Sequence, residues 1–393
     1  MGKKSKWIDY NIAEDIINRL RVLKEKGAES GHQVSFEKVP EVKFDGNGFD
    51  GLRDILINNL KFDDNVPYDK KIYFLTYALF EAAKKNIFDQ GAINEFIKKH
   101  ETTFLLSKKK KYILLTSLSV KYGQYLSRIK VNDVTISFLK NRPKNFDIVK
   151  NVKDVLEKIL NVETPSYYTY VKVSVPARCQ EEAYEKAFAN LDFIRGIWNF
   201  TLNLNKGLRT STLKTNPVNN LVYGPVHTLH NEKGEMYPNC WGWQPEHSPD
   251  MQLADINSDY KIMKQNEESI RKELNRKNPY TAFLKRAIIR YVRALDDPLM
   301  TTAFIKLWSV LEYLTITGFS SYEITIDRAS KIFKDKKYCK YILNALKRKR
   351  NNIIHNGDVF DTAEQDLYRL MTYVNLIFKY LLESTKIFKN TVE

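Results

Sequence analysis

An arginine, an asparagine and a histidine lie close together in the stretch RKRNNIIHNGD, which spans residues 348–358. Asn351 directly follows Arg350, and His355 comes five residues after the arginine. An imidazole can accept or give a proton near neutral pH, and a guanidinium keeps its charge while its planar donors match phosphate oxygens. These residue types therefore suit chemistry at a phosphodiester bond.

The stretch has the pattern of a helix that ends at Gly357, since glycine favours the left-handed position after the last turn. On such a helix Arg350 and His355 point about 140° apart, whereas Asn351 and His355 share one face. We therefore expect Asn351 to orient the imidazole. The competing interpretation is a helix C-terminus that carries Arg and His only because they interact favourably with its dipole.

Cleavage of RNA without a metal needs a base for the 2′-hydroxyl proton, an acid for the leaving 5′-oxygen and a fixed cation for the phosphate. One copy of Arg350 and His355 supplies only part of this set. Two copies brought together across a dimer axis would supply two of each.

The charge of the chain favours a polyanionic partner. The 393 residues carry a formal net charge of +16, which favours nucleic acid, although a solvated lysine surface would give the same total. Nine Lys or Arg residues and one acid, Asp335, lie within 331–350. We expect Lys347, Arg348 and Lys349, which flank the motif, to contact RNA phosphates.

The compartment is predicted from apolar runs and cysteines. No apolar run is long enough to cross a bilayer, and the charged N-terminus lacks the apolar segment of a secretory signal. Three scattered cysteines, Cys179, Cys240 and Cys339, argue against a disulfide framework. We expect a cytoplasmic protein with no membrane partner.

Periodicity predicts an α+β chain that is mainly α. Residues 1–165 read as a mixed helix and strand domain, with a helix over 145–163, and residues 166–250 continue this α+β region as a regulatory or sensor part. Residues 251–393 read as a helical bundle. Asp297 before Pro298 predicts the start of one of its helices, whose buried stripe would comprise Phe304, Leu307, Trp308, Leu311 and Leu314.

The order of these C-terminal segments resembles the HEPN superfamily of helical-bundle ribonucleases, and most of all its ApeA-like branch, over about residues 285–390. The family carries an R-x(4–6)-H motif with a polar residue after the arginine, matched by Arg350, Asn351 and His355. The branch also tends to show an upstream LW..LE.L helix, matched by Leu307, Trp308, Leu311, Glu312 and Leu314. One departure is Asn356, which separates His355 from the glycine.

The resemblance implies a homodimer whose two motifs form one active site, which cleaves RNA without a metal or cofactor and leaves 2′,3′-cyclic phosphate ends. It further implies a role in anti-phage defence or as a toxin, with a possible phage-derived trigger. Arg350 and His355 would be catalytic, Asn351 orienting, and Glu312 would either hold one of them or be an exposed helix glutamate. Because a scaffold alone does not establish catalysis, a non-catalytic HEPN-fold module that binds RNA or protein is the alternative.

A second group of residues has ligand types for zinc. His227, His230, Cys240 and His247 form H-x2-H-x9-C-x6-H, but two residues three apart on a strand face opposite sides of the sheet. We expect structural roles for them and no metal or cofactor.

Overall fold

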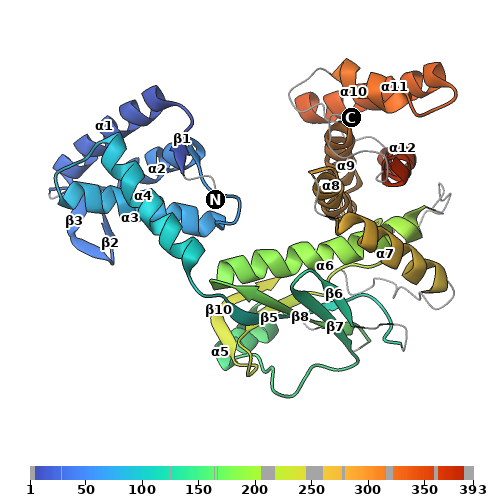
Figure 1. Cartoon of the computed structure of the whole chain (residues 1–393), viewed down its shortest axis with the longest axis horizontal. Coiled ribbons are helices and arrows are strands. Elements are labelled where there is room, and N and C mark those ends of the chain that lie inside the picture. Colours follow the sequence, from blue (N-terminus) through green and yellow to red (C-terminus); the bar gives the residue numbers. More distant parts are fainter. Residues whose placement is uncertain are drawn as a thin grey trace. The chain divides into compact units, whose positions relative to one another are not determined.

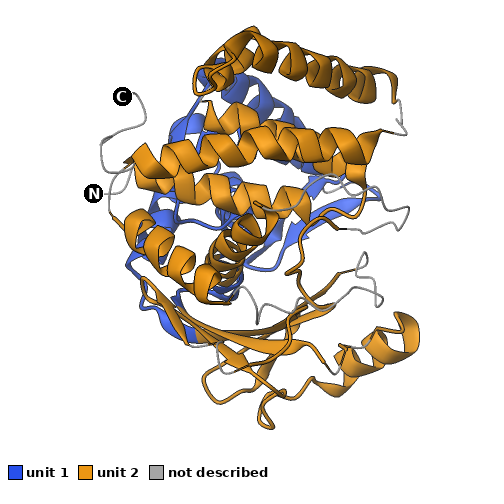
Figure 2. Cartoon of the chain, turned by 90° about the vertical axis from the view of Figure 1, so that its right-hand side faces the viewer, with its two compact units in different colours: residues 1–111, 176–185 blue, residues 112–175, 186–393 orange. Residues whose placement is uncertain are grey.

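The computed structural model describes residues 5–27, 29–123, 126, 128–162, 164, 165, 167–204, 217–244, 260–276, 279–315, 322–357 and 362–384. The chain divides into two compact units, coloured separately in Figure 2. The first unit comprises Met1–Lys111 and Pro176–Glu185, and the second comprises Tyr112–Val175 and Lys186–Glu393.

The first unit combines helices with two antiparallel strand pairs, β1 with β4 and β2 with β3. Its elements are β1 (Lys6–Trp7), α1 (Tyr10–Lys26), β2 (Gln33–Phe36), β3 (Val39–Asp45), α2 (Phe49–Asn58), β4 (Leu60–Lys61), α3 (Tyr68–Lys84) and α4 (Gln90–Leu106). Asp9 caps α1 by accepting hydrogen bonds from the backbone N–H groups of Asn11 and Ile12. Apolar residues from these elements form one core, in which the Phe44 and Phe80 rings lie 4.9 Å apart.

The second unit is organised around a six-stranded sheet in the order β10-β9-β5-β8-β7-β6. The strands are β5 (Lys110–Leu118), β6 (Ile129–Val131), β7 (Val134–Leu139), β8 (Thr169–Ala177), β9 (Val226–His230) and β10 (Met236–Trp243). The domain boundary expected at residue 165 falls between strands of this sheet, because β5 to β7 precede it and β8 to β10 follow it. Strands on both sides of the expected boundary therefore belong to one sheet.

Helices cover both faces of the sheet (Figure 1). Helix α6 (Gln180–Asn203) covers one face, toward which the buried valines 171, 173 and 175 of β8 point. Helix α5 (Lys150–Asp154) and the π-helix η1 (Val155–Ile159) pack against the opposite face, where Val152 and Leu156 meet Met236 and Val226. The single helix expected over 145–163 is therefore two short segments of different helix type.

The C-terminal part of the second unit is helical. It contains α7 (Tyr260–Leu274), α8 (Pro279–Leu295), α9 (Met300–Leu314), α10 (Tyr322–Ser330), α11 (Lys336–Asn356) and α12 (Ala363–Glu383). Helix α9 packs against α8 and α12, and all five residues of its predicted stripe are buried. The predicted helix start at Asp297 is wrong, because α9 begins at Met300, although Asp297 accepts a hydrogen bond from the backbone N–H of Leu299.

The predicted fold class is confirmed. A mixed helix and strand region leads into helices α7 to α12, and helix is the main element of the chain. Within the described ranges, no helix combines the length and apolar character needed to span a membrane.

Candidate functional site

Helix α11, which carries the Arg350–His355 motif, packs on the bundle through one face. Cys339, Leu343 and Leu346 are buried at the spacing of a single helix face. Arg350 follows Leu346 by one more turn and is half-buried. The arginine of the motif therefore lies on the packed side of the helix.

Arg350 is held by an aromatic ring and by its neighbour. The guanidinium carbon lies 4.9 Å from the ring centroid of Tyr322 in α10, a favourable cation–π distance. Nη1 donates a 3.2 Å hydrogen bond to Asn351 Oδ1. Nε is sealed from solvent and has no hydrogen-bond partner among the described residues, so the anchored guanidinium still has one donor without an acceptor.

Glu312 is linked to Arg350 through two aromatic side chains. Trp308 Nε1 donates a 2.9 Å hydrogen bond to Glu312 Oε1, and the Trp308 and Tyr322 rings lie 6.5 Å apart with their planes at 65°. Tyr322 in turn contacts Arg350. The half-buried Glu312 carboxylate therefore fixes Trp308, which contributes to the surface that positions Arg350.

Two of the three expected RNA contacts are paired within the bundle. Lys347 Nζ lies 2.5 Å from Glu323 Oε1, and Lys349 Nζ lies 2.5 Å from Oδ2 of the buried Asp366. Their charges are already balanced, which makes them weaker candidates for phosphate contacts than the sequence indicates. Arg348 is exposed and forms no ion pair with a described residue.

His355 lies in the last turn of α11 and is exposed. Its imidazole makes no hydrogen bond to another described residue, and the Asn351 oxygen accepts from Arg350. The expected orientation of His355 by Asn351 is thus not formed within a single chain. Gly357 ends the helix as predicted, with φ of 71° and a 3.1 Å hydrogen bond from its N–H to Ile353 O.

The helix places Arg348, and not Arg350, on the same side as His355. Residues seven apart are offset by only about 20° on a helix, against about 140° for residues five apart. Tyr341, Arg348 and His355 have this spacing, and all three are exposed. The seven-residue interval is visible in the sequence, where Arg348 was predicted as a phosphate contact and not as a partner of His355.

The arrangement in one chain is chemically incomplete. It offers the exposed His355 imidazole and, on the same side of the helix, the Arg348 guanidinium, which forms no ion pair with a described residue. The Arg350 guanidinium is anchored on the packed side of the helix. Cleavage of a phosphodiester by general acid and base needs two proton-transfer groups. A second copy of this helix end would provide the missing imidazole.

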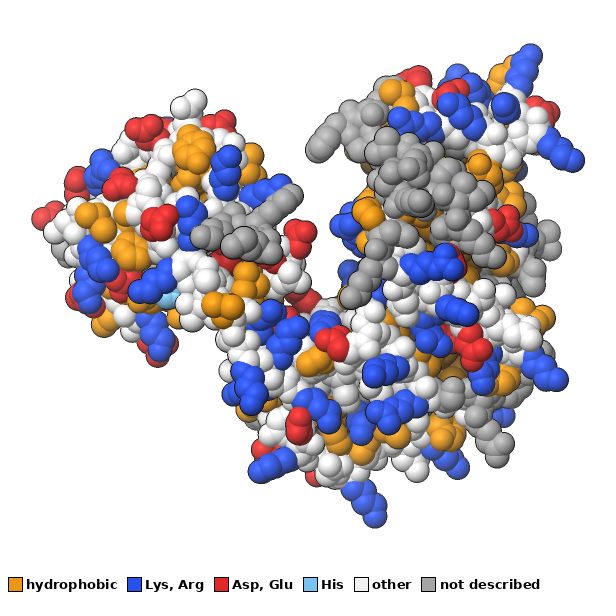
Figure 3. Space-filling view, viewed as in Figure 1, with side chains coloured by type: hydrophobic (Ala, Val, Ile, Leu, Met, Phe, Trp, Pro, Cys, Tyr) orange, Lys and Arg blue, Asp and Glu red, His pale blue; other side chains and the backbone are white. Residues whose placement is uncertain are grey.

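Basic side chains are not confined to α11. On the face drawn in Figure 3, Lys and Arg cover the region of α10 and α11 and also the sheet, with acidic side chains among them. Charge alone therefore does not locate a nucleic-acid interface on this face.

The second group of candidate residues includes His227 and His230, which form hydrogen bonds within the fold. His227 Nδ1 lies 2.6 Å from Thr116 Oγ1, and its ring packs edge-on to Phe188 of α6. His230 lies on the opposite face of β9, with Nδ1 2.8 Å from Gly234 O and Nε2 2.8 Å from Thr228 Oγ1. Cys240 is half-buried, and His247 lies outside the described residues. The described residues contain no cluster of His, Cys, Asp and Glu suited to a metal ion.

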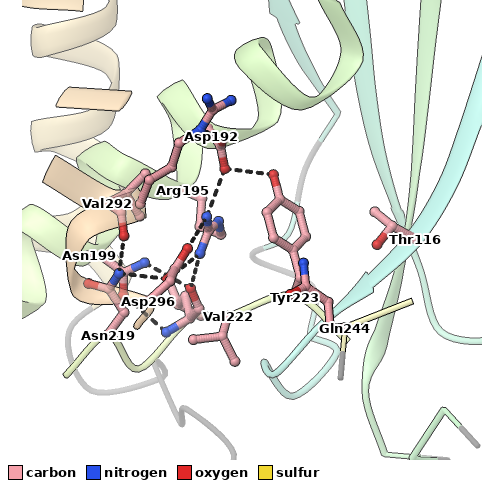
Figure 4. A network of polar contacts seen from close by, with 12 residues as sticks. Thr116, Asp192, Arg195, Asn199, Asn219, Val222, Tyr223, Gln244, Val292 and Asp296 are labelled. Atoms are coloured by element: carbon pink, nitrogen blue, oxygen red, sulfur yellow. Dashed lines mark hydrogen bonds and ion pairs between the residues drawn. The ribbon is translucent and has the colours of Figure 1, made fainter. Parts of the chain in front are cut away.

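A buried charge network that the sequence did not predict joins α6 to α8 (Figure 4). Arg195 is completely buried and donates to both carboxylate oxygens of Asp296 at 2.7 and 2.6 Å and to Asp192 at 2.7 Å. Asp192 also accepts from Arg293 and from the Tyr223 hydroxyl. Arg195 and Asp296 are 101 residues apart, and no local pattern in the sequence links them.

The network favours the charged forms of Arg195 and Asp192. Burial lowers the pKa of Arg195, but Asp296, Tyr223 and Asp192 outweigh it, so the pKa lies above its ordinary value. Burial likewise raises the pKa of Asp192, but Arg195 and Arg293 lower it further than burial raises it. These pairings are characteristic of a structural ion network, and we assign it no catalytic role.

Comparison of the chain with family models, with curated proteins and with solved structures finds no significant match.

Proposed function

We propose that the chain is a metal-independent endoribonuclease of the HEPN type. Two copies would place their α11 ends together and form one composite active site. The observation that carries the proposal is the exposed His355 imidazole in the last turn of α11, on the same side of the helix as Arg348. Neither side chain has a partner among the described residues, and the same helix anchors Arg350. The R-x4-H pattern and the helices around it, with their resemblance to the HEPN superfamily, give the reaction class.

The proposed reaction uses both imidazoles. His355 of one copy takes the proton of the 2′-hydroxyl, the 2′-oxygen attacks phosphorus, and the bond from phosphorus to the 5′-oxygen breaks. The second copy's His355 gives its proton to the departing 5′-oxygen, which leaves a 2′,3′-cyclic phosphate and a 5′-hydroxyl. Arg348 and Arg350 stabilise the negative charge that develops on the phosphate.

The proposed setting is the bacterial cytoplasm, where such an enzyme acts as a toxin or in anti-phage defence. A nuclease that attacks cellular RNA must be restrained. The sheet of the second unit and the separate first unit are the candidates for that restraint and for sensing a trigger.

Cleavage is tested with purified protein, total RNA or tRNA, and EDTA. We expect His355→Ala and Arg350→Ala to lower the cleavage rate about 10²–10⁴-fold. Lys334→Ala, an exposed charge outside α11, is the matched control and should retain activity. Equal cleavage by all variants would identify a contaminating nuclease, and RNA binding without cleavage by the wild type would favour a non-catalytic module.

The dimer is tested by disulfide cross-linking at Asn352, which is exposed on α11 between Arg348 and His355. Oxidised Asn352→Cys should form covalent dimers. Lys379→Cys, an exposed position on α12, and the wild type give the background. If Asn352→Cys forms no more dimer than these controls, the α11 ends do not meet and the composite site is disproved.

A further inference from the structure

A pocket of about 570 Å³ lies on the face of the sheet opposite α6, away from the α11 motif. Its wall is formed by residues from the segment before α5, from η1 and the turn after it, and from β8 and β9; they include Arg142, Leu156, Val162, Thr164, Tyr170 and Val226. The volume lies within the range of about 300–1,000 Å³ that holds small-molecule ligands. Leu156 in this wall also belongs to an apolar cluster with Val152 and Met236.

The arginine in this wall is incompletely paired. Arg142 Nε donates a 2.7 Å hydrogen bond to Phe146 O, whereas Nη2 is sealed from solvent with no hydrogen-bond partner among the described residues. Nη1 is not sealed, and it too forms no hydrogen bond to a described residue. Burial lowers the pKa of Arg142 more than Tyr170 and Asp147 raise it. The site therefore holds a cation that its surroundings do not fully compensate, and a bound anion would supply the missing acceptor.

The other charges of the pocket do not replace that acceptor. Lys153 pairs with Glu157 at 3.6 Å, which leaves Arg142 and Asp147 as the remaining charged residues in the wall. Asp147 is exposed and forms no ion pair with Arg142 within the 4.0 Å reach of a salt bridge. The Asp147 carboxylate would repel an incoming anion, but its exposure to water screens that repulsion.

The backbone around the pocket is irregular in a way that is common at functional sites. Leu160 N donates to Val155 O at 3.0 Å, the i→i+5 bond of a π-helix, and π-helical turns occur frequently at functional sites. Asn161 then adopts φ of 49° and Val162 N returns to Leu156 O at 2.9 Å. This turn places Leu156 and Val162 in the same wall.

We propose that this pocket binds a small organic anion. Its carboxylate, sulfonate or phosphate group pairs with Arg142, and its apolar or aromatic body lies against Tyr170, Leu156 and Val162. The inference is independent of the proposed nuclease activity.

The probes are 1-anilinonaphthalene-8-sulfonate and its neutral analogue N-phenyl-1-naphthylamine, followed by fluorescence titration of the full chain. We expect saturable binding of the sulfonate at one site. Arg142→Met should weaken binding of the sulfonate by at least tenfold and leave binding of the neutral analogue unchanged. Thr164→Trp, which adds bulk to the wall, should weaken binding of both probes.

Arg128→Met removes an exposed arginine of the same unit and is the matched control, which should bind the sulfonate as the wild type does. Asp147→Asn should strengthen sulfonate binding a few-fold, because it removes a carboxylate in the wall that repels the sulfonate. Circular dichroism and a thermal melt confirm that each variant is folded. Non-saturable binding, equal affinity of Arg142→Met and wild type, or equal losses in Arg142→Met and Arg128→Met would each overturn the proposal.

Discussion

The same side chain has opposite surroundings at two places in the molecule: Arg195 lies where α6 contacts α8, and Arg348 lies on the exposed side of α11. Arg195 is fully buried and donates to two carboxylates and to Leu221 O. Arg348 is exposed and has no ion-pair partner among the described residues. The histidines differ in the same way, since both ring nitrogens of His230 are hydrogen-bonded within the fold, whereas His355 makes no hydrogen bond to another residue in the described ranges.

The difference separates residues that hold the fold together from residues that can act on a partner. Removal of one member of a buried ion network destabilises the fold by several kcal/mol, because the remaining charge is left buried without its partner. An exposed side chain with no partner among the described residues contributes little to stability, so its substitution tests a role in recognition or catalysis with little effect on the fold. Stability and activity measurements on matched variants test this separation.

The largest expected effect is on stability, from Arg195→Met. The substitution leaves Asp296 without its bidentate partner and Asp192 with Arg293 as its remaining arginine. We expect the free energy of unfolding to fall by about 3–5 kcal/mol, the usual result of breaking a buried ion pair. Urea titration followed by circular dichroism measures it. A loss below about 1 kcal/mol would contradict the structural role of the network.

A smaller loss is expected from Lys349→Met, which leaves the buried Asp366 carboxylate without its ion-pair partner on α11. Asp366 keeps its hydrogen bond from Thr362, and we expect the free energy of unfolding to fall by about 1–3 kcal/mol, the usual contribution of a hydrogen bond to a charged group. If Lys349 is instead mainly an RNA contact, the variant will keep its stability and lose RNA affinity. Lys336→Met, at the exposed start of α11, is the control for charge removal.

His230 should make stability depend on pH. Burial lowers the pKa of this imidazole, an effect that Arg142 reinforces and that the hydrogen bond to Gly234 O partly offsets. The unfolded chain therefore binds a proton more readily than the native protein, so stability is full above about pH 6.5 and falls as the pH drops below it. The slope from one such group is at most about 1.4 kcal/mol per pH unit.

The measurement is urea unfolding at pH 7.5, 6.5 and 5.5. The decrease in the free energy of unfolding between pH 7.5 and 5.5 should be smaller in His230→Gln than in the wild type. It should be unchanged in His355→Gln, because His355 is exposed. An equal slope in wild type and His230→Gln would show that other groups cause the acid sensitivity.

The smallest effect on stability is expected from Arg348→Met, within about 0.5 kcal/mol of the wild type. Its effect on RNA should be clear, because the loss of one phosphate contact lowers the salt dependence of log K by about 0.7 for single strands. Fluorescence anisotropy with a labelled RNA at several salt concentrations measures this slope. An unchanged slope would remove Arg348 from the proposed interface.

Local signals in the sequence predicted the helical elements well. The three- and four-residue spacing of Leu307, Leu311 and Leu314 identified the buried face of α9, and Gly357 marked the end of α11 because few other residues adopt its backbone conformation. The π-helix after Asp154 was missed, because the apolar spacing of residues 145–163 also fits an ordinary helix. Its geometry depends on packing against β9 and β10.

The site was predictable only in part. Residue types and spacing identified Arg350 and His355, but the pairing of Lys347 with Glu323 and of Lys349 with Asp366 joins residues 24 and 17 positions apart on different helices. The Arg195 network was not predicted for the same reason, because Arg195 and Asp296 are 101 residues apart in the sequence. Tertiary neighbours decide which charges are balanced, and a single sequence does not name them.

The close contact of α6 with α8 at Gly196, next to Arg195, determines which fragments of this chain can fold. A Cβ atom at this position would lie 2.6 Å from Ile288 Cγ2, so α6 has no room for a side chain where it packs against Ile288 of α8. A fragment that starts at Tyr260 would expose this surface of α8 to water and leave Asp296 without Arg195. A fragment that contains only helices α7 to α12 would therefore be unstable. A fragment designed to carry the α11 motif should also include α6.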